Sequence, residues 1–229
     1  MPYLCPLMRI KAVKAIFLKE WIVERKNPHV IGGLFLYVVS TVFVTWLALV
    51  RLQNVPLWNA LFWVIALFGV FNSSHRVFSQ EIGTQQYYLH QMAKPLEVLF
   101  GKLLFSVLVN SILLVFTFVV FLWFFGWPGE EEGNWLALFA TSFIGVLGLS
   151  GMLTLMSGIA YQAGNNPSLI AILGLPVVLP LLMLCIKVTK LILDGVAASV
   201  WSDYAFSLAG LTVAIIALAS VLFPYLWSD

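Results

Sequence analysis

Charged residues are scarce in this sequence. Asp, Glu, Lys and Arg make up only 10% of its 229 residues, whereas 62% are hydrophobic and the mean hydropathy is +1.00. A soluble domain of this length cannot bury so much apolar surface, so the composition excludes an ordinary soluble fold. The sequence therefore predicts a membrane protein.

A phosphate-binding loop is also missing. The only Gly-Lys pair, Gly101 and Lys102, is followed by Leu103 and has no upstream glycine at the spacing that such a loop requires. No catalytic constellation is visible elsewhere in the sequence. We therefore expect that the chain is not an enzyme, and that another chain supplies the energy for any work.

Uncharged apolar runs divide the chain into membrane spans. Six stretches contain no Asp, Glu, Lys, Arg or His, and all but the second approach or exceed the roughly 20 residues that cross a bilayer core as a helix. These predicted membrane helices are residues 30–50, 57–72, 103–125, 135–160, 168–186 and 206–226. The runs are continuous, unlike the short alternating segments of a membrane β-barrel. We expect an all-α membrane protein in which residues 1–229 form a single transmembrane domain.

Lysine and arginine determine the expected orientation. Nine of the twelve lie before the first span or in the segment between the second and third spans, and three lie in the loops on the other side. The positive-inside rule then places the N-terminus, the segment 73–102 and the C-terminus in the cytoplasm.

This orientation limits the metal and redox chemistry that the chain can offer. Cys5 and Cys185 are predicted on opposite sides of the membrane and cannot form a disulfide. His29, His75 and His90 are all predicted on the cytoplasmic side, so a haem site on the outer face would receive no histidine from this chain. Ligation by methionine or tyrosine stays open, but we predict no metal site and no directly bound cofactor.

Residues 8–28 are too charged to span the bilayer and are predicted to form a helix along the cytoplasmic membrane surface, in contact with lipid. At 100° per residue, its predicted apolar face consists of Ile10, Val13, Phe17 and Trp21. Glu20 and Glu24 border that face. The alternative is a basic flank whose only role is to set the orientation of the first span.

Ionisable side chains are missing from all six predicted spans. Proton- or ion-coupled carriers usually need such groups inside the bilayer, which argues against a secondary transporter or an ion channel. Asn110, in the third span, is a polar residue that could line a path. A hydrogen bond between two helices is the favoured interpretation.

Glycines and prolines mark the fourth and fifth spans. Gly145, Gly148 and Gly151 recur every three residues and predict a face where helix backbones approach closely, within the subunit or between subunits. Pro176 and Pro180 are predicted to bend the fifth helix, either as a static kink or as part of a gate.

The segment 73–102 mixes charged residues with aromatic and aliphatic ones. Such a segment is expected to form short helices at the membrane surface and to present a patch to a soluble partner. The alternative is a loop that packs only on its own bundle.

Three stretches resemble a known family. The run FSQEIGTQQYYLHQMAKPLEVLFGKLL resembles the segment between the second and third membrane helices of type-2 ATP-binding cassette (ABC) exporter permeases. In that class an acidic residue and Gly-Thr precede a short helix, a proline turn and a Gly-Lys pair that begins the third membrane helix. IFLKEWIVERKNP and LGLPVVLPLLM are more narrowly similar to the haem exporter protein B family, CcmB, the permease subunit of the cytochrome c maturation system.

The resemblance implies a function and partners. Two copies would pair with each other and with two copies of a cytoplasmic ATPase, CcmA, which would bind ATP and Mg²⁺. They would associate with the membrane subunits CcmC and CcmD. ATP hydrolysis would drive haem delivery, or release of the haem-loaded chaperone CcmE from CcmC, in a bacterial or organellar inner membrane. Haem would be handled by the complex, and no nucleic acid would be bound. Carried over by motif, the ATPase contact would involve Glu81, Gly83 and Thr84, with the return to the membrane shaped by Lys94, Pro95 and Lys102.

Two other functions share this layout. A type-2 permease could export a lipid, a polysaccharide or a drug. A membrane anchor of an assembly complex would transport nothing and would not respond to nucleotide hydrolysis.

Overall fold

Seven helices make up nearly all of the described chain. The computed structural model describes residues 10–49, 54–74, 93–128, 134–163 and 167–227, and within these ranges there is no strand. The helices are α1 (Ile10–Lys26), α2 (Pro28–Ala48), α3 (Val55–Ser74), α6 (Pro95–Phe125), α7 (Trp135–Gln162), α8 (Pro167–Leu193) and α9 (Ala198–Trp227). Six of them, all but α1, are long and apolar enough to cross a membrane. The predicted all-α fold with six membrane helices is confirmed.

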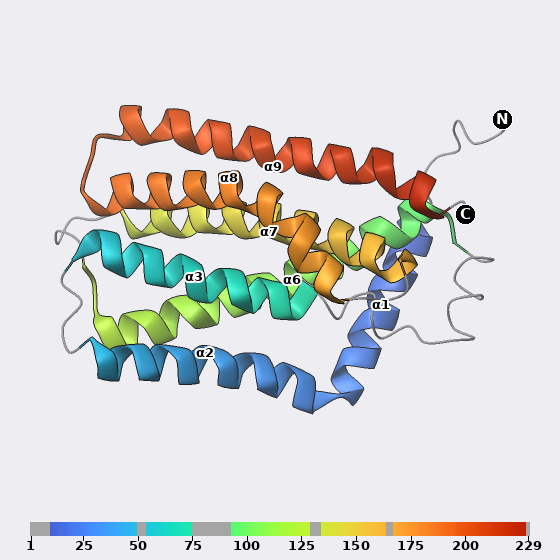
Figure 1. Ribbon diagram of the computed structural model, residues 1–229, viewed down its shortest axis with the longest axis horizontal. Coiled ribbons are helices and arrows are strands. Elements are labelled where there is room, and N and C mark those ends of the chain that lie inside the picture. The colour runs from blue at the N-terminus through green and yellow to red at the C-terminus, as the bar shows by residue number, and fades with distance from the viewer. Residues whose placement is uncertain (1–9, 50–53, 75–92, 129–133, 164–166, 228–229) are drawn as a thin grey trace.

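The six long helices lie side by side along the longest axis of the molecule, and α1 crosses one end of this bundle (Figure 1). Successive long helices run in opposite directions, so the C-terminal ends of α3, α7 and α9 lie at the same end as α1. We call this the α1 end and the opposite one the far end. Asn27 alone separates α1 from α2, and it leaves the helical conformation (φ −117°, ψ 64°) before Pro28 begins α2. The residue before a proline disfavours the helical conformation, and proline suits the first position of a helix. The break between α1 and α2 at Asn27 therefore follows from the sequence.

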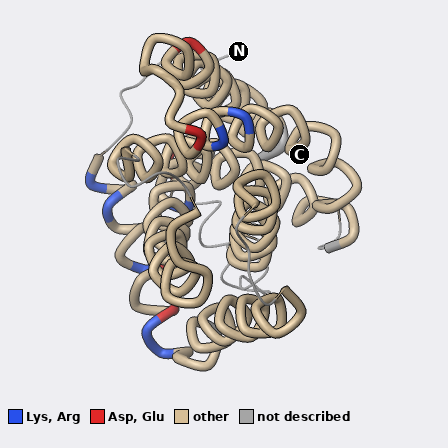
Figure 2. Tube along the Cα trace, turned by 90° about the vertical axis from the view of Figure 1, so that its left-hand side faces the viewer, with Lys and Arg blue, Asp and Glu red and all other residues tan. Residues whose placement is uncertain are grey.

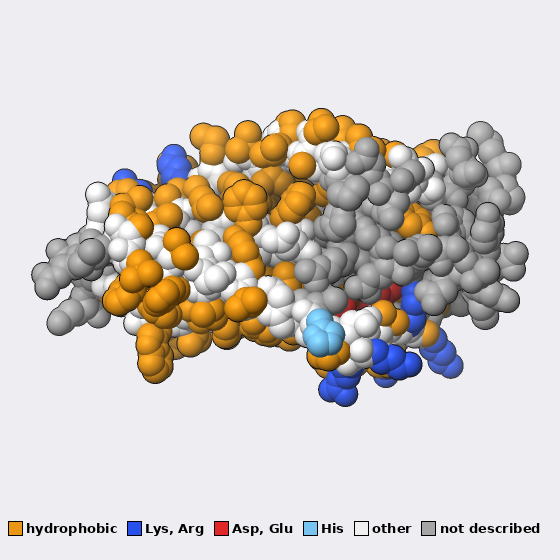
Figure 3. All heavy atoms as spheres, turned by 60° about the horizontal axis from the view of Figure 1, so that its bottom comes forward, with side chains coloured by type: hydrophobic (Ala, Val, Ile, Leu, Met, Phe, Trp, Pro, Cys, Tyr) orange, Lys and Arg blue, Asp and Glu red, His pale blue; other side chains and the backbone are white. Residues whose placement is uncertain are grey.

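The most buried of the six long helices is α7, which packs on α3, α6, α8 and α9. Exposed large apolar side chains occur on every one of these helices, and they cover the middle of the face shown in Figure 3. Lipid tails solvate such a surface, whereas water would not. Lys and Arg lie instead along α1, at the edge of the bundle, and beside acidic residues at the far end (Figure 2).

Several helices run past their predicted limits. α6 begins at Pro95 rather than at residue 103, α8 continues to Leu193 rather than to 186, and α9 begins at Ala198 rather than at 206. Charged residues ended the apolar runs in the sequence, but backbone hydrogen bonds propagate a helix through isolated charges near its ends. The Gly-Lys pair is therefore not the start of the third membrane helix, because it lies nearly two turns inside α6.

The buried side of α1 coincides only in part with the predicted apolar face, since the two share Val13. The side chains that α1 buries are Val13, Ile16, Glu20 and Glu24, whereas Ile10 is 78% exposed. Periodicity favoured the apolar side, but the buried side includes both carboxylates because a buried cation from α6 meets one of them.

The helix α8 stays helical through Pro176 and Pro180, and its axis turns away from that of its neighbours in the half that contains them (Figure 1). Both prolines are exposed on the surface of the bundle. Their proposed part in gating stays a prediction.

Candidate coupling site at the junction of α1 and α6

The residues predicted to contact an ATPase, and those predicted to shape the return to the membrane, form two groups. Glu81, Gly83 and Thr84 lie outside the described residues, so that contact stays a prediction. Lys94 and Pro95 lie at the start of α6, where the backbone N–H of Lys94 donates to Oε2 of Glu97 (3.2 Å) and Pro95 occupies the first turn. This arrangement satisfies an amide that the helix itself cannot bond.

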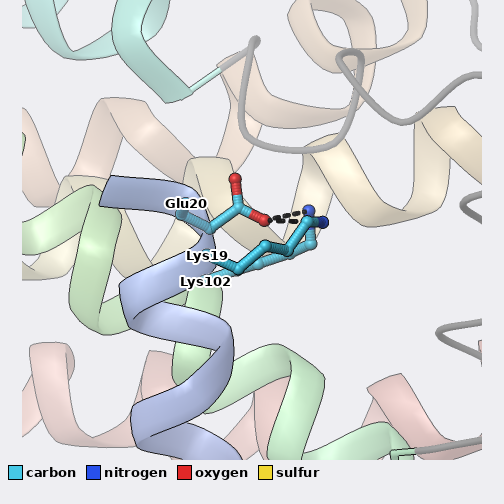
Figure 4. A network of polar contacts seen from close by, with 3 residues as sticks. All are labelled: Lys19, Glu20 and Lys102. Carbon is cyan, nitrogen blue, oxygen red and sulfur yellow. Dashed lines mark hydrogen bonds and ion pairs between the residues drawn. The ribbon is translucent and has the colours of Figure 1, made fainter. Parts of the chain in front are cut away.

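Lys102 is completely buried, and its ammonium group pairs with a carboxylate from another helix. Its Nζ lies 3.3 Å from Oε1 of Glu20 on α1, a residue that is only 5% exposed. The partly exposed Lys19 approaches the same oxygen at 3.3 Å, so two cations converge on one carboxylate (Figure 4). In a buried ion pair of this kind each charge depends on the other, because removal of one partner leaves the remaining charge buried and uncompensated.

The backbone of α6 has a gap into which α1 fits. A Cβ atom at Gly101 would lie 2.7 Å from Cγ2 of Ile16 and 3.3 Å from the carbonyl oxygen of Val13, so only glycine allows this approach. Ile16 packs there with Val98 in a small apolar cluster separate from the main core. Gly101 thus allows α1 to approach, and the next residue, Lys102, neutralises the Glu20 carboxylate of α1.

The helix α1 covers Lys102, which therefore does not contact an external protein directly in this arrangement. Its ion pair with Glu20 gives Lys102 a direct connection to α1. Glu24 and Glu97 are also buried, at 8% and 2% exposure, so acidic groups concentrate at the α1 end of α6 and on the inner side of α1.

Two polar clusters connect helices inside the bundle. Nδ2 of Asn110 on α6 donates to Oγ of Ser150 on α7 at 2.9 Å, which confirms the predicted interhelical hydrogen bond. Among the described residues, Oδ1 of Asn110 has no hydrogen-bond partner.

The second cluster joins α3 to α8. Nδ2 of Asn59 donates to the carbonyl oxygen of Ile186 at 2.7 Å, and its Oδ1 lies 2.8 Å from Oγ1 of Thr189. Thr189 also accepts a hydrogen bond from Nε1 of Trp63 at 3.0 Å. Both atoms of the Asn59 amide are therefore satisfied by a neighbouring helix.

The three glycines of α7 face its neighbours within the subunit. A Cβ atom at Gly145 would lie 2.6 Å from Sγ of Cys185 on α8, and one at Gly148 would lie 2.8 Å from Oγ1 of Thr212 on α9. At Gly151 the nearest atom, Cγ1 of Ile216 on α9, is 3.2 Å away.

With this geometry in view, we compared the chain with known proteins. A family model described as CcmB protein matches residues 11–225, a range that reaches from α1 into α9. The chain belongs to the CcmB family. The family resemblance inferred from sequence motifs is confirmed, and CcmB is the permease component of the ABC system for cytochrome c maturation. No curated protein matches the chain.

CcmB-family permeases generally work with the ATPase CcmA and other Ccm subunits. In this CcmB-family chain, sequence reasoning identified Lys102 but missed its partner, Glu20. A signal was present: Glu20 and Glu24, one turn apart, are the only acidic residues of an otherwise basic helix, and Lys102 follows an apolar stretch. No group of three or more His, Cys, Asp or Glu side chains suited to a metal occurs in the described ranges.

Asn59 and Asn110, both buried in this CcmB-family chain, are expected to differ in their contribution to stability. Asn59→Leu should lower the free energy of unfolding by about 1–2 kcal/mol, because it removes hydrogen bonds made by both amide atoms. Asn110→Leu should cost less than about 1 kcal/mol, because it also removes an unsatisfied oxygen. SDS-induced unfolding in mixed micelles measures both values. An equal or larger loss at Asn110 would contradict this interpretation.

Proposed function

We propose that this chain is the permease subunit through which a CcmA-like ATPase drives release of haem-loaded CcmE from a CcmC-like subunit. Membership of the CcmB family supports the assignment to this system. The observation that carries the coupling role is the buried ion pair between Lys102 and Glu20, which joins α1 to α6. A second copy of the chain and a CcmD-like subunit complete the proposed assembly.

The proposed path of coupling begins at the α1 end. Because α1 is held to α6 by an ion pair and by close packing at Gly101, a displacement of one helix moves the other. α6 has 31 residues, which corresponds to about 46 Å at 1.5 Å per residue. It contacts α2, α3, α7 and α9, so a movement started at one end reaches most of the bundle.

The distribution of charge supports a cytoplasmic location for the α1 end. Five basic residues lie on α1, and two more, Lys94 and Lys102, lie near the start of α6. The described basic residues of the far end are Lys187 and Lys190 on α8. By the positive-inside rule, both termini then lie in the cytoplasm. Membership of the CcmB family supports the inner membrane of a bacterium or organelle as the location.

ATP binding is assigned to the partner, since the sequence has no phosphate-binding loop. Haem is handled by the complex rather than by a recognisable motif of this chain. The proposed role is therefore transmission of force, without catalysis by the permease itself.

The experiment uses the complete complex, purified with its ATPase, and the variants Glu81→Ala and Gly83→Pro. We expect both variants to assemble but to lower ATP turnover, and we expect haem-loaded CcmE to accumulate on the membrane complex when the chain is deleted. Asp203→Ala, at the far end, is the matched control and should leave turnover unchanged.

Two results would count against the proposal. Unchanged ATP turnover in both Glu81→Ala and Gly83→Pro would show that the segment around Glu81 takes no part in coupling. Normal release of CcmE without the chain would reject the role in release, and loss of assembly alone would indicate a membrane anchor.

A further inference from the structure

The charges of α1 are sorted between its two sides. Its two acidic residues, Glu20 and Glu24, are both buried, and Glu20 is paired with Lys102. Four of its five basic residues are exposed: Lys11, Lys14, Arg25 and Lys26. The outward side of α1 is therefore cationic and carries no carboxylate.

None of these four cations pairs with a carboxylate in the described part of the chain. Arg25 instead lies over the ring of Trp21, with 4.9 Å between its guanidinium carbon and the ring centroid. Three large aliphatic side chains share the exposed side: Ile10, Leu18 and Ile22, at 78%, 45% and 53% exposure. Basic groups interspersed with exposed aliphatic ones are the pattern of a helix at a lipid surface, where the stems enter the acyl boundary and the charges meet headgroups.

The position of α1 indicates what faces this side. α1 crosses the end of the bundle, and one residue separates it from the membrane helix α2, so it lies at the level where that span begins (Figure 1). Seen along the bundle, α1 with its Lys and Arg residues lies at one edge of the molecule (Figure 2), and four of these basic residues are exposed. A face at that level and in that direction meets the headgroups of the surrounding bilayer.

We propose that the outer face of α1, formed by Lys11, Lys14, Leu18, Ile22, Arg25 and Lys26, binds the headgroup layer of anionic phospholipids. The phosphate-bearing headgroups supply the negative charge that the buried carboxylates of α1 do not, and the aliphatic side chains enter the layer beneath them. An acidic surface of a protein partner would pair with the cations but would leave the exposed Leu18 and Ile22 side chains without an apolar contact. Lipid binding of this kind anchors the unit of α1 and α6 at the membrane surface, independently of the proposed coupling to an ATPase.

The test places an environment-sensitive fluorophore at Leu18→Cys in the full chain carrying Cys5→Ser, reconstituted in vesicles. Cys185 is buried and should not react. Changing the vesicles from phosphatidylcholine to an equal mixture with phosphatidylglycerol should shift the emission to the blue and reduce acrylamide quenching about twofold. Added salt should weaken both effects, because it screens exposed charges.

Matched variants separate charge from folding. Replacing the four cations together, as Lys11→Gln, Lys14→Gln, Arg25→Gln and Lys26→Gln, should abolish the dependence on phosphatidylglycerol. The variant Lys11→Arg, Lys14→Arg and Lys26→Arg keeps the charge and should retain the dependence on phosphatidylglycerol. Lys187→Gln combined with Lys190→Gln, at the far end, should retain that dependence as well. The same quenching in both kinds of vesicle would overturn the proposal. So would protection of the fluorophore that appears only when the ATPase is added, which would identify a protein surface as the partner.

Discussion

Replacing Lys102 with methionine is expected to lower the free energy of unfolding by about 3 kcal/mol, because it leaves the buried Glu20 carboxylate without its buried partner. Methionine fills a similar volume, so the loss reports the charge rather than a cavity. The partly exposed Lys19 still reaches Glu20, which keeps the expected loss at the lower end for a broken buried pair. SDS-induced unfolding of the purified chain, followed by circular dichroism, measures it.

Two further variants test the cause. Glu20→Gln combined with Lys102→Met removes both charges of this pair and should recover a large part of the lost stability, since the Glu20 carboxylate is no longer left without its buried partner. Lys190→Ala breaks the pair with Asp194, whose 3.9 Å contact is substantially exposed, and should cost less than about 1 kcal/mol. A double variant as unstable as Lys102→Met alone would show that packing, not charge, is responsible.

Replacing Gly145 with alanine is expected to lower the free energy of unfolding by about 2 kcal/mol, because the added methyl group has no space. Its Cβ would lie 2.6 Å from Sγ of Cys185 and 2.7 Å from Cη2 of Trp63. The indole of Trp63 cannot easily withdraw, since its N–H donates to Thr189. The strain would push α7 away from both α3 and α8, and the same unfolding assay measures it.

Gly210→Ala is the matched control for this substitution. Gly210 lies in α9, and a Cβ atom there meets nothing within 4 Å. Because alanine favours a helix over glycine, this variant should be neutral or more stable by up to about 1 kcal/mol. A loss at Gly210 as large as that at Gly145 would contradict this interpretation, because neither helix propensity nor a close contact predicts a loss at Gly210.

The membrane helices were predictable from short-range properties of the chain. Whether a segment enters a bilayer depends mainly on its own apolar content, so six spans follow from counting uncharged residues. The limits of α6, α8 and α9 were not predictable in this way, because Lys102, Lys190 and Asp203 interrupt the apolar pattern without interrupting the helix.

The candidate site was only partly predictable. Lys102 and the glycines of α7 stood out in the sequence through their residue type and spacing. The buried partner of Lys102 did not, because Glu20 only borders the apolar face that the periodicity of its helix predicts. A carboxylate is buried there because a cation from a distant segment neutralises it. The sequence of α1 alone does not show which cation that is.

The sequence by itself determined the membrane class, the number of spans, the asymmetry of basic residues and the resemblance to the CcmB family, because these depend on composition and motifs. Only the tertiary structure decided which side of α1 is buried, that Gly101 admits Ile16, and that Gly145 faces Cys185 and Trp63. Those features arise when helices distant in the chain dock together, since close packing and charge pairing between helices depend on their relative position and not on either sequence alone.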